Sequence, residues 1–333
     1  MILTKTPLRL SLFGGATDLA AFYQRSPGSV FGGAINKYIY VALKPRFDGK
    51  TRACYSRTEI VDDPSILEHD IVRTALLKAK VSGIDFVSFS DVPPDGSGLG
   101  SSSALTVGLV NAISVLKGTR ASCEQDELAA EACKIEIEEC HKPIGKQDQY
   151  FSAMGGVREF TFESSGAVSS KITYHSHARE LRENLLLLHT KLPRQSDLLL
   201  MEQRANTLSS DTTFRTLQAM AQMAEDAADK VRRGVFTQLG EMLDTAWKLK
   251  KTLANGISTV QIDAWYEKAK EAGALGGKIL GAGGGGFLVF FAPPDKHANI
   301  ISALPDLPPI SFDWDHSGTQ VVYQAQSAPD IFF

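Results

Sequence analysis

Cysteine and long apolar runs are both scarce in this sequence. The chain has four cysteines among 333 residues, and none of them forms the CxxC spacing of a metal-binding motif. Three of the four lie between residues 123 and 140, where reduced thiols of a cytosolic protein are the expected state. No apolar run approaches the roughly 18 residues that a membrane helix requires. The sequence therefore predicts neither a metal-thiolate site nor a membrane span.

A strong charge of either sign is also missing. The formal net charge is −3, so nothing favours a nucleic acid or a membrane surface as a partner. Residues 1–14 carry Lys5 and Arg9 and contain no small-residue cleavage site, so we expect no signal peptide and a cytoplasmic location. The hydrophobic content is 43%, which is enough for a sizeable core, and the chain length suggests two domains.

A glycine- and serine-rich loop, residues 93–104 (PPDGSGLGSSSA), is the most informative segment. It follows an alternating, strand-like run at 84–92 and precedes an apolar, helix-like run at 104–116. Such a loop offers backbone N–H groups and the positive end of a helix dipole to an anion, and its serines can contact phosphate or magnesium. No lysine follows Gly98 or Gly100, so this is not a Walker A loop. A nucleotide phosphate site is predicted, with a flexible turn as the alternative.

Two further segments extend this pattern, residues 7–18 (PLRLSLFGGATD) and 278–287 (KILGAGGGGF). Together with the first loop they resemble the three signature motifs of the GHMP kinase superfamily, which includes galactokinase, homoserine kinase, mevalonate kinase and phosphomevalonate kinase. The resemblance extends to about Phe291, and the order and spacing of the motifs make it specific. It implies a two-domain α+β fold with a ribosomal protein S5 domain 2-like N-terminal domain and a ferredoxin-like C-terminal domain.

Hydrophobic periodicity also predicts two halves that mix strands and helices. Strands are expected at 8–13, 38–43, 84–92, 157–162, 185–190, 278–280, 287–291 and 320–324. Helices are expected at 65–81 (with Ser65 as the candidate N-cap), 104–116, 124–141, 211–233, 236–254, 259–272 and 297–304. A loose stretch at 163–170 separates an ATP-binding domain, residues 1–170, from a C-terminal domain, residues 171–333.

Phosphoryl transfer needs a phosphate cradle, a metal ion, a group that orients the acceptor and positive charge where negative charge develops. The cofactors expected are ATP and Mg²⁺, and Mg²⁺ prefers hard oxygen ligands. Ser102 is the expected hydroxyl ligand, with Ser101 and Ser103 as rivals. Resemblance to galactokinases selects Glu136 as the carboxylate, against the alternative of a solvated helix face. The predicted ATP cradle comprises Pro94, Gly96, Gly98, Leu99, Gly100, Ser101, Ser102 and Ser103.

Asp148 lies in GKQDQY, residues 145–150, which looks like the Gly-x-x-Asp-Gln signature of sugar-type GHMP kinases. There the aspartate accepts or orients the substrate hydroxyl, and a carboxylate suits this role because it makes a strong charge-assisted hydrogen bond. The alternative is a helix N-cap, since a helix could begin at Gln149. Arg9 matches the family arginine near this aspartate, where it stabilises charge during transfer; a structural ion pair is its alternative.

The remaining substrate-side candidates come from the first and third motifs. Asp18 matches the galactokinase aspartate that hydrogen-bonds sugar hydroxyls, but residues 14–18 (GGATD) depart from the galactokinase Gly-Glu-His-Thr-Asp, which argues against galactose. Glycines let the backbone approach a ligand closely, although a tight turn is the alternative. Two basic residues could hold a substrate phosphate, with solvated surface charge as the alternative. The predicted substrate residues are Asp18, Gly14, Gly15, Thr17, Gly283, Gly284, Gly285, Lys146 and Arg194.

Within the superfamily, the first motif looks most like the D-glycero-D-manno-heptose-7-phosphate kinases, which use Gly-Gly-Gly-Thr-Asp where this chain has Ala16 in the middle. This resemblance implies phosphorylation of the anomeric C1 hydroxyl of a seven-carbon sugar phosphate, for nucleotide-activated heptose and capsule or lipopolysaccharide biosynthesis. A fucokinase-like or other mannose-configured sugar 1-kinase and a non-catalytic sugar sensor remain alternatives. Homoserine and mevalonate kinase fit the Asp-Gln signature less well. A homodimer is left open.

Overall fold

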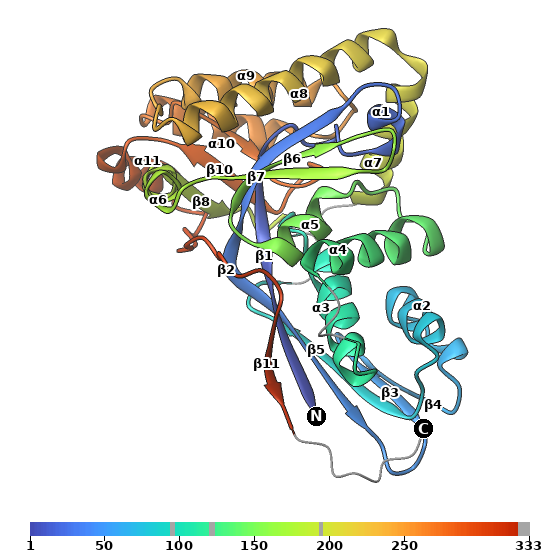
Figure 1. Cartoon of the computed structure of the whole chain (residues 1–333). Helices are drawn as coiled ribbons and strands as arrows, with labels where there is room; N and C mark the ends of the chain where they lie inside the picture. Colours follow the sequence, from blue (N-terminus) through green and yellow to red (C-terminus); the bar gives the residue numbers. More distant parts are fainter. Residues whose placement is uncertain (94–96, 120–123, 193–195, 326–333) are drawn as a thin grey trace.

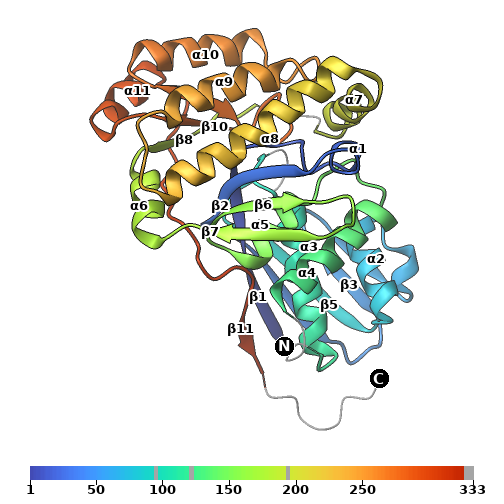
Figure 2. The ribbon, with the colours of Figure 1, turned by 45° about the horizontal axis from the view of Figure 1, so that its top comes forward.

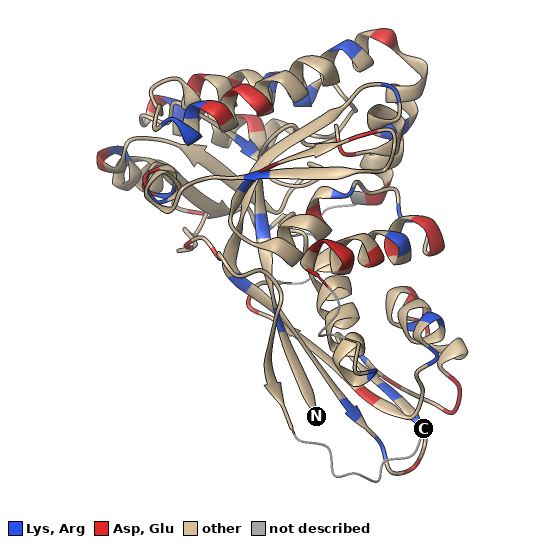
Figure 3. Ribbon diagram, in the orientation of Figure 1, with Lys and Arg blue, Asp and Glu red and all other residues tan. Residues whose placement is uncertain are grey.

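The computed structural model describes residues 1–93, 97–119, 124–192 and 196–325. Three predicted site residues, Pro94, Gly96 and Arg194, lie outside the described residues. Among the described residues, no helix combines the length and the apolar character needed to cross a membrane. Charged residues of both signs alternate along the visible helices (Figure 3), in keeping with the small net charge.

The first layer is an eight-stranded sheet ordered β11-β1-β2-β5-β3-β4, with β6 and β7 continuing from β2. Its pairings are antiparallel except for β3 with β5. The two longest strands of the layer are β1 and β2. The first motif, residues 7–18, covers the second half of β1 and the start of the loop that leads to β2. The strands are β1 Ile2–Phe13, β2 Gly28–Pro45, β3 Thr51–Cys54, β4 Thr58–Val61, β5 Ile84–Ser90, β6 Val157–Phe162, β7 Val168–Ile172 and β11 Gln320–Gln324.

Helix α3 (Ser101–Leu116) lies at the centre of this layer. It packs on β1 and β2 and is covered by α2 (Asp70–Ala79), α4 (Gln125–Cys133) and α5 (Gln147–Met154) (Figure 1). Because α3 is enclosed on most sides, its sequence is apolar on nearly all faces rather than amphipathic. The packing directs the α3 N-terminus, which follows the glycine loop, towards the second layer.

The second layer is a three-stranded antiparallel sheet, β8 (Leu185–His189), β10 (Phe287–Phe291) and β9 (Gly276–Ile279), in that order. All five residues of β10 are buried, which explains its uninterrupted apolar sequence. Helix α8 packs against β2, β6 and α9 and so joins the two layers (Figure 2). The helices of this half are α6 His175–Glu183, α7 Ser196–Ser209, α8 Asp211–Arg232, α9 Leu239–Lys251, α10 Val260–Glu271 and α11 His297–Ala303, with the short η4 Pro294–Lys296 before α11.

The chain returns to the first layer at its end, because β11 pairs with β1 and lies beside it in Figure 1. The division expected between residues 170 and 171 falls within β7 and stays a prediction. The α+β expectation is confirmed, and most strands and helices lie within a few residues of their predicted bounds. Helices α6 and α7 were not predicted, nor were the short α1 (Ala20–Tyr23) and the strands β3, β4 and β7, the last of which begins inside the stretch expected to be loose. Strands β1 and β2 begin at Ile2 and Gly28, well before their predicted starts at 8 and 38.

Three local predictions need correction. Residues 65–81 form a short 3₁₀ turn, η1 (Pro64–Ile66), and then α2, whose N-cap is His69. Ser65 is not a cap, because its N–H donates to Asp63 Oδ1. The single helix expected at 124–141 is α4 followed by a π-helical turn, η3 (Lys134–Glu139). Helix α5 begins at Gln147, so Asp148 lies inside its first turn and does not cap it.

Candidate active site

A cavity of about 410 Å³ lies between the two layers. The first layer contributes β1, the loop after it, the glycine–serine loop and the segment around the start of α5. The second layer contributes α7, α9 and the start of the third glycine motif. The lining residues used below are Arg9, Gly15, Ala16, Asp18, Ser97, Gly98, Gly100, Ser101, Ser102, Ser103, Glu136, Lys142, Gly145, Gln147, Asp148, Asp197, Gln203, Lys250, Gly281 and Ala282.

The glycine–serine loop is held against β1 at the N-terminus of α3. The Arg9 N–H donates to the Leu99 carbonyl over 3.0 Å, and the Arg9 side chain donates from Nη1 to the Gly98 carbonyl. Gly100 is the N-cap of α3 and has a φ of 79°, a conformation that favours glycine. Ser97 Oγ and Ser101 Oγ are hydrogen-bonded over 2.9 Å. The N-terminus of this 16-residue helix lines the cavity, and the first N–H groups of a helix have no acceptor within the helix, which suits an anion.

Arg9 and Asp148 form a two-pronged ion pair beside this loop. Arg9 Nε donates to Asp148 Oδ1 over 2.8 Å, and Nη2 donates to Oδ2 over 2.6 Å. Arg9 is buried, whereas the Asp148 side chain keeps 23% of its surface exposed to the cavity. A β-carbon at Gly100 would lie 3.3 Å from Asp148 Oδ2, so the carboxylate is directly adjacent to the helix N-terminus. This geometry brings the two predicted catalytic residues together.

Glu136 lies on the other side of the α3 N-terminus, and its hydrogen-bond donors among the described residues are neutral. Ser102 Oγ donates to Oε1 over 2.8 Å, and Gln149 Nε2 donates to Oε2 over 2.6 Å. The side chain is fully buried, and burial raises the pKa of Glu136 to about 7. The π-helical turn that contains Glu136 is a form often found at functional sites. The structure thus brings together both residues predicted to bind a metal.

Asp18 is buried and held by three N–H groups. It accepts from the backbone N–H of Ala16 over 3.1 Å, and from the backbone and side chain of Gln147, each over 3.0 Å. A β-carbon at Gly145 would overlap Asp18 Oδ2, so this close approach requires glycine. Burial raises the pKa of Asp18 to about 6. Asp18 lines the cavity and also anchors the segment that carries Asp148.

The other residues of the first motif divide into two groups. Gly15 and Ala16 line the cavity, and Ala16 has a φ of 82°, the conformation that the glycine of the resembling motif would adopt freely. Gly14 and Thr17 are not among the lining residues. Thr17 Oγ1 instead lies 2.8 Å from the carbonyl oxygens of Gly14 and Ser29, which pins the loop to β2. Their contribution is to hold the loop in shape.

The third motif lines the cavity through Gly281 and Ala282. Gly283, Gly284 and Gly285 are not among the described lining residues, and two of them face the second layer: a β-carbon at Gly283 would lie 2.7 Å from Ile257 Cα, and one at Gly285 would lie 2.7 Å from the Leu192 carbonyl oxygen. Lys146 is likewise absent from the lining, and its Nζ lies 4.8 Å from the centre of the Tyr23 ring.

Several polar residues of the site were missed by the sequence analysis. Lys250 and Gln203 line the cavity from the second layer, and Lys142 lines it from the first, where it pairs with Asp70 over 2.7 Å. Lys278 is buried and donates to the Leu12 carbonyl over 3.0 Å, and its pKa is lowered to about 7 by burial and by the charge of Arg9. A signal existed for Lys250, because it continues the buried stripe of Leu243, Ala246 and Trp247 on α9.

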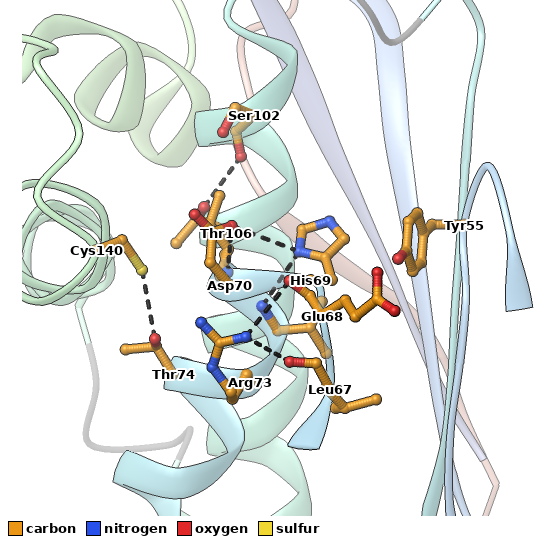
Figure 4. A network of polar contacts seen from close by, with 12 residues as sticks. Tyr55, Leu67, Glu68, His69, Asp70, Arg73, Thr74, Ser102, Thr106 and Cys140 are labelled. Carbon is orange, nitrogen blue, oxygen red and sulfur yellow. Dashed lines mark hydrogen bonds and ion pairs between the residues drawn. The ribbon is translucent and has the colours of Figure 1, made fainter. Parts of the chain in front are cut away.

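A second cavity, of about 480 Å³, adjoins the first and shares Ser101, Ser102 and Lys142 with it. Its other described lining residues are Ile39, Tyr55, Ser56, His69, Asp70, Ile71, Ser88, Phe89, Ser90 and Leu105. Figure 4 shows the His69 ring between Tyr55 and Asp70, below Ser102. The rings of Tyr55 and His69 meet edge to face at 4.7 Å, which gives this cavity an aromatic wall. Sequence patterns gave no signal for it.

Comparison with known proteins agrees with this arrangement. The models for the GHMP kinases N terminal domain and the GHMP kinases C terminal domain match residues 69–156 and 227–309. A D-glycero-alpha-D-manno-heptose 7-phosphate kinase of Campylobacter jejuni is 31% identical over 318 residues, which cover 91% of this chain and 93% of that protein. An L-fucokinase/L-fucose-1-P guanylyltransferase of Bacteroides fragilis is 28% identical over 67% of this chain and 23% of its own length.

Solved structures share the fold over nearly the whole chain. A D-glycero-D-manno-heptose 1-phosphate kinase from Bacteroides thetaiotaomicron superposes with a TM-score of 0.79 at 21% identity, covering 98% of this chain and 100% of that one. A putative sugar kinase from Campylobacter jejuni has a TM-score of 0.76 at 29% identity, covering 96% of this chain and 97% of its own.

Proposed function

The chain belongs to the GHMP kinase family and is a sugar kinase that uses ATP, and we propose that its acceptor is the anomeric C1 hydroxyl of D-glycero-D-manno-heptose 7-phosphate. The observation that carries the proposal is the position of the Arg9–Asp148 pair, directly against the α3 N-terminus. An acceptor hydroxyl bound by Asp148 would lie next to a phosphate bound by the glycine–serine loop, as transfer between the two requires.

The two cavities divide the nucleotide between them. We place the phosphates against residues 97–103, where the helix N-terminus and four serine residues line the first cavity. The base then enters the second cavity, whose aromatic wall of Tyr55, His69 and Phe89 suits a flat ring. Ser101, Ser102 and Lys142 line both cavities, so the triphosphate would pass between them at this point.

Ser102 and Glu136 fit a magnesium ion. Both supply hard oxygen atoms, both line the first cavity, and the described donors of the buried Glu136 carboxylate are neutral. The described residues contain no group of three or more His, Cys, Asp or Glu side chains that could hold a metal ion, at this site or away from it, but Mg²⁺ bound to ATP needs few protein ligands. When bound, the ion would neutralise charge on the phosphate oxygens. Ser102 and Glu136 would hold it over the loop.

Asp148 and Arg9 would act on the acceptor. Each oxygen of Asp148 accepts one N–H from Arg9 and keeps a lone pair for a hydroxyl group. Asp148 can therefore orient the acceptor hydroxyl and take its proton late in the transfer. Arg9, which is always charged, offsets the negative charge that builds up between the two reactants.

Such a reaction would take place in the cytoplasm and would supply heptose for capsule or lipopolysaccharide.

The test is ADP release by the purified protein with Mg-ATP and D-glycero-D-manno-heptose 7-phosphate, mannose, fucose, galactose, homoserine or mevalonate. We expect turnover to be highest with the heptose phosphate, and phosphorus NMR of the product to place the new phosphate on C1. Turnover confined to a plain hexose would keep the mechanism and change the acceptor. Sugar binding without any turnover would instead make the chain a sensor.

A further inference from the structure

The second layer supplies two buried polar side chains to the wall of the cavity that Arg9 and Asp148 also line. Lys250 of α9 is 5% exposed and Gln203 of α7 is 2% exposed, and both line the cavity. Neither has a role in the transfer described above, because the phosphate loop, Arg9 and Asp148 all belong to the first layer. Lysine is rarely buried to this extent, so Lys250 is a candidate for a role in binding.

Both side chains are fixed beside the third motif. Lys250 Nζ donates to the Gly281 carbonyl and lies 3.4 Å from the Ile279 carbonyl oxygen. Gln203 Nε2 lies 3.3 Å from the Ala282 carbonyl oxygen. These contacts hold the ammonium and the amide next to Gly281 and Ala282, where the backbone itself lines the cavity. They also define a rival explanation, in which Lys250 only holds this segment in place.

The cations around the cavity have different neighbours. Arg9 is bound to Asp148, and Lys142 is bound to Asp70. Both of these side chains come from the first layer, whereas Lys250 is the cation that the described part of the second layer contributes to the lining. The same wall also includes the carboxylate of Asp197. Lys146, predicted to bind a substrate phosphate, contacts the Tyr23 ring instead.

We propose that Lys250, together with the Gln203 amide, binds the phosphate group that the acceptor sugar already carries. This inference rests on the proposed function, because a heptose 7-phosphate whose C1 hydroxyl meets Asp148 must extend its phosphate-bearing end away from the phosphate loop. In the described part of the second layer, Lys250 is the positively charged residue of the cavity wall. The ammonium is a compact positive charge that binds a phosphate oxygen, and the amide N–H donates a further hydrogen bond to the phosphate. The site thus selects a phosphorylated sugar over a plain one.

The decisive variant is Lys250→Gln, which keeps N–H donors for the carbonyls of Gly281 and Ile279 and removes the charge. The experiment compares kcat/KM for D-glycero-D-manno-heptose 7-phosphate with kcat/KM for the same heptose without phosphate. Lys251→Gln is the matched control, because Lys251 is on the same helical turn but pairs with Asp263 over 3.0 Å. ADP affinity, measured by calorimetry, and the melting temperature report whether each variant is folded.

We expect the unaltered protein to prefer the phosphorylated heptose. Lys250→Gln should lower kcat/KM for that acceptor about 10- to 100-fold, the value of a hydrogen bond to a charged group, and leave the plain heptose and ADP affinity within about threefold. Lys250→Arg should recover part of the loss, and Lys251→Gln should show none.

Equal losses on both acceptors would assign Lys250 to holding the glycine segment and would overturn the inference. An unchanged preference in Lys250→Gln, or no preference in the unaltered protein, would overturn it too. Should Lys250→Gln fail to fold, Gln203→Leu tests the same site by removing the amide donor, and a loss of equal size on both acceptors in that variant would overturn the inference. Failure of the proposed function is a separate result, namely that the unaltered protein turns over another acceptor and not the heptose phosphate.

Discussion

The two sides of the α3 N-terminus hold their carboxylates in different ways. On the acceptor side, Asp148 is bound through both oxygens by the guanidinium of Arg9. On the other side, Glu136 is fully buried and is held by the hydroxyl of Ser102 and the amide of Gln149. The acceptor side therefore contains a balanced pair of charges, whereas the described hydrogen-bond donors of the Glu136 carboxylate are neutral.

The difference shows which carboxylate has its charge balanced by a residue of the protein itself. Neutral donors do not offset the cost of burying a negative charge, so the pKa of Glu136 rises to about 7. A divalent cation would supply the missing charge, and the carboxylate would then ionise fully. Asp18 shows the same effect, since its donors are also neutral N–H groups and burial raises its pKa to about 6.

Asp148→Asn should have the largest effect. The amide cannot take the acceptor proton and breaks the charge balance with Arg9, so we expect kcat to fall about 10³- to 10⁴-fold. Binding of the sugar phosphate, measured by calorimetry, should change by less than about tenfold. Turnover equal to that of the unaltered protein would remove Asp148 from the mechanism.

Glu136→Gln should change the pH dependence of stability. Because the pKa of Glu136 is raised in the folded state, its ionisation destabilises the protein as pH rises from about 4.5 towards 7. Without divalent cations, the free energy of unfolding should therefore fall by about 2 kcal/mol more in the unaltered protein than in Glu136→Gln between pH 5 and 7.5. Denaturant titrations at several pH values measure this difference, and parallel curves for the two proteins would contradict it.

Gly100→Ala should disturb the point where the two sides meet. The residue has a φ of 79°, and the new methyl group would lie 3.3 Å from Asp148 Oδ2 and 3.4 Å from Arg9 Cγ. We expect a loss of about 1–2 kcal/mol in the free energy of unfolding, together with reduced kcat. Gly118→Ala is the matched control, because its φ is 71° and no atom of the described residues lies within 4 Å of its added β-carbon. An equal kcat in both variants would show that the ion pair tolerates the methyl group.

Ala16→Gly should have the smallest effect. Ala16 has a φ of 82°, and its N–H donates to Asp18. Glycine relieves the backbone strain of about 1 kcal/mol but increases the entropy of the unfolded chain, so we expect a net gain of about 0.5 kcal/mol or less. A thermal melt measures it, and a loss above about 1 kcal/mol would show that the Ala16 methyl group contributes packing that outweighs the strain.

The sequence predicted the first-layer side of this site more completely than the second-layer side. Each of these first-layer residues lies in a short sequence motif or at a fixed short distance from one: the glycine loop, Arg9, Glu136 and Asp148. The structure brings them together around one helix N-terminus. The π-helical turn at Glu136 was not predictable, because its apolar pattern is that of an ordinary helix. Gly283 and Gly285 show a different limit, since glycine is required equally by a ligand and by close packing against Ile257 and Leu192.

The second-layer side depends on contacts between distant segments. Lys250 stands beside Lys248 and Lys251 in the last turn of α9, and their charges alone do not distinguish the buried lysine from its neighbours. The burial of Lys250 follows from the packing of α9 on β9, which brings it to the carbonyls of Ile279 and Gly281. The second cavity likewise gathers residues from β2, β5, α2 and α3, which no single motif contains.

The most direct test of the contrast between the two carboxylates is a magnesium titration of turnover at saturating ATP and acceptor. We predict that Glu136→Gln raises the Mg²⁺ concentration for half-maximal rate at least about tenfold, because it removes a charged ligand. Asp148→Asn should lower the maximal rate and leave that concentration unchanged. An unchanged magnesium requirement in Glu136→Gln, or the same shift in both variants, would contradict the division of roles between Glu136 and Asp148.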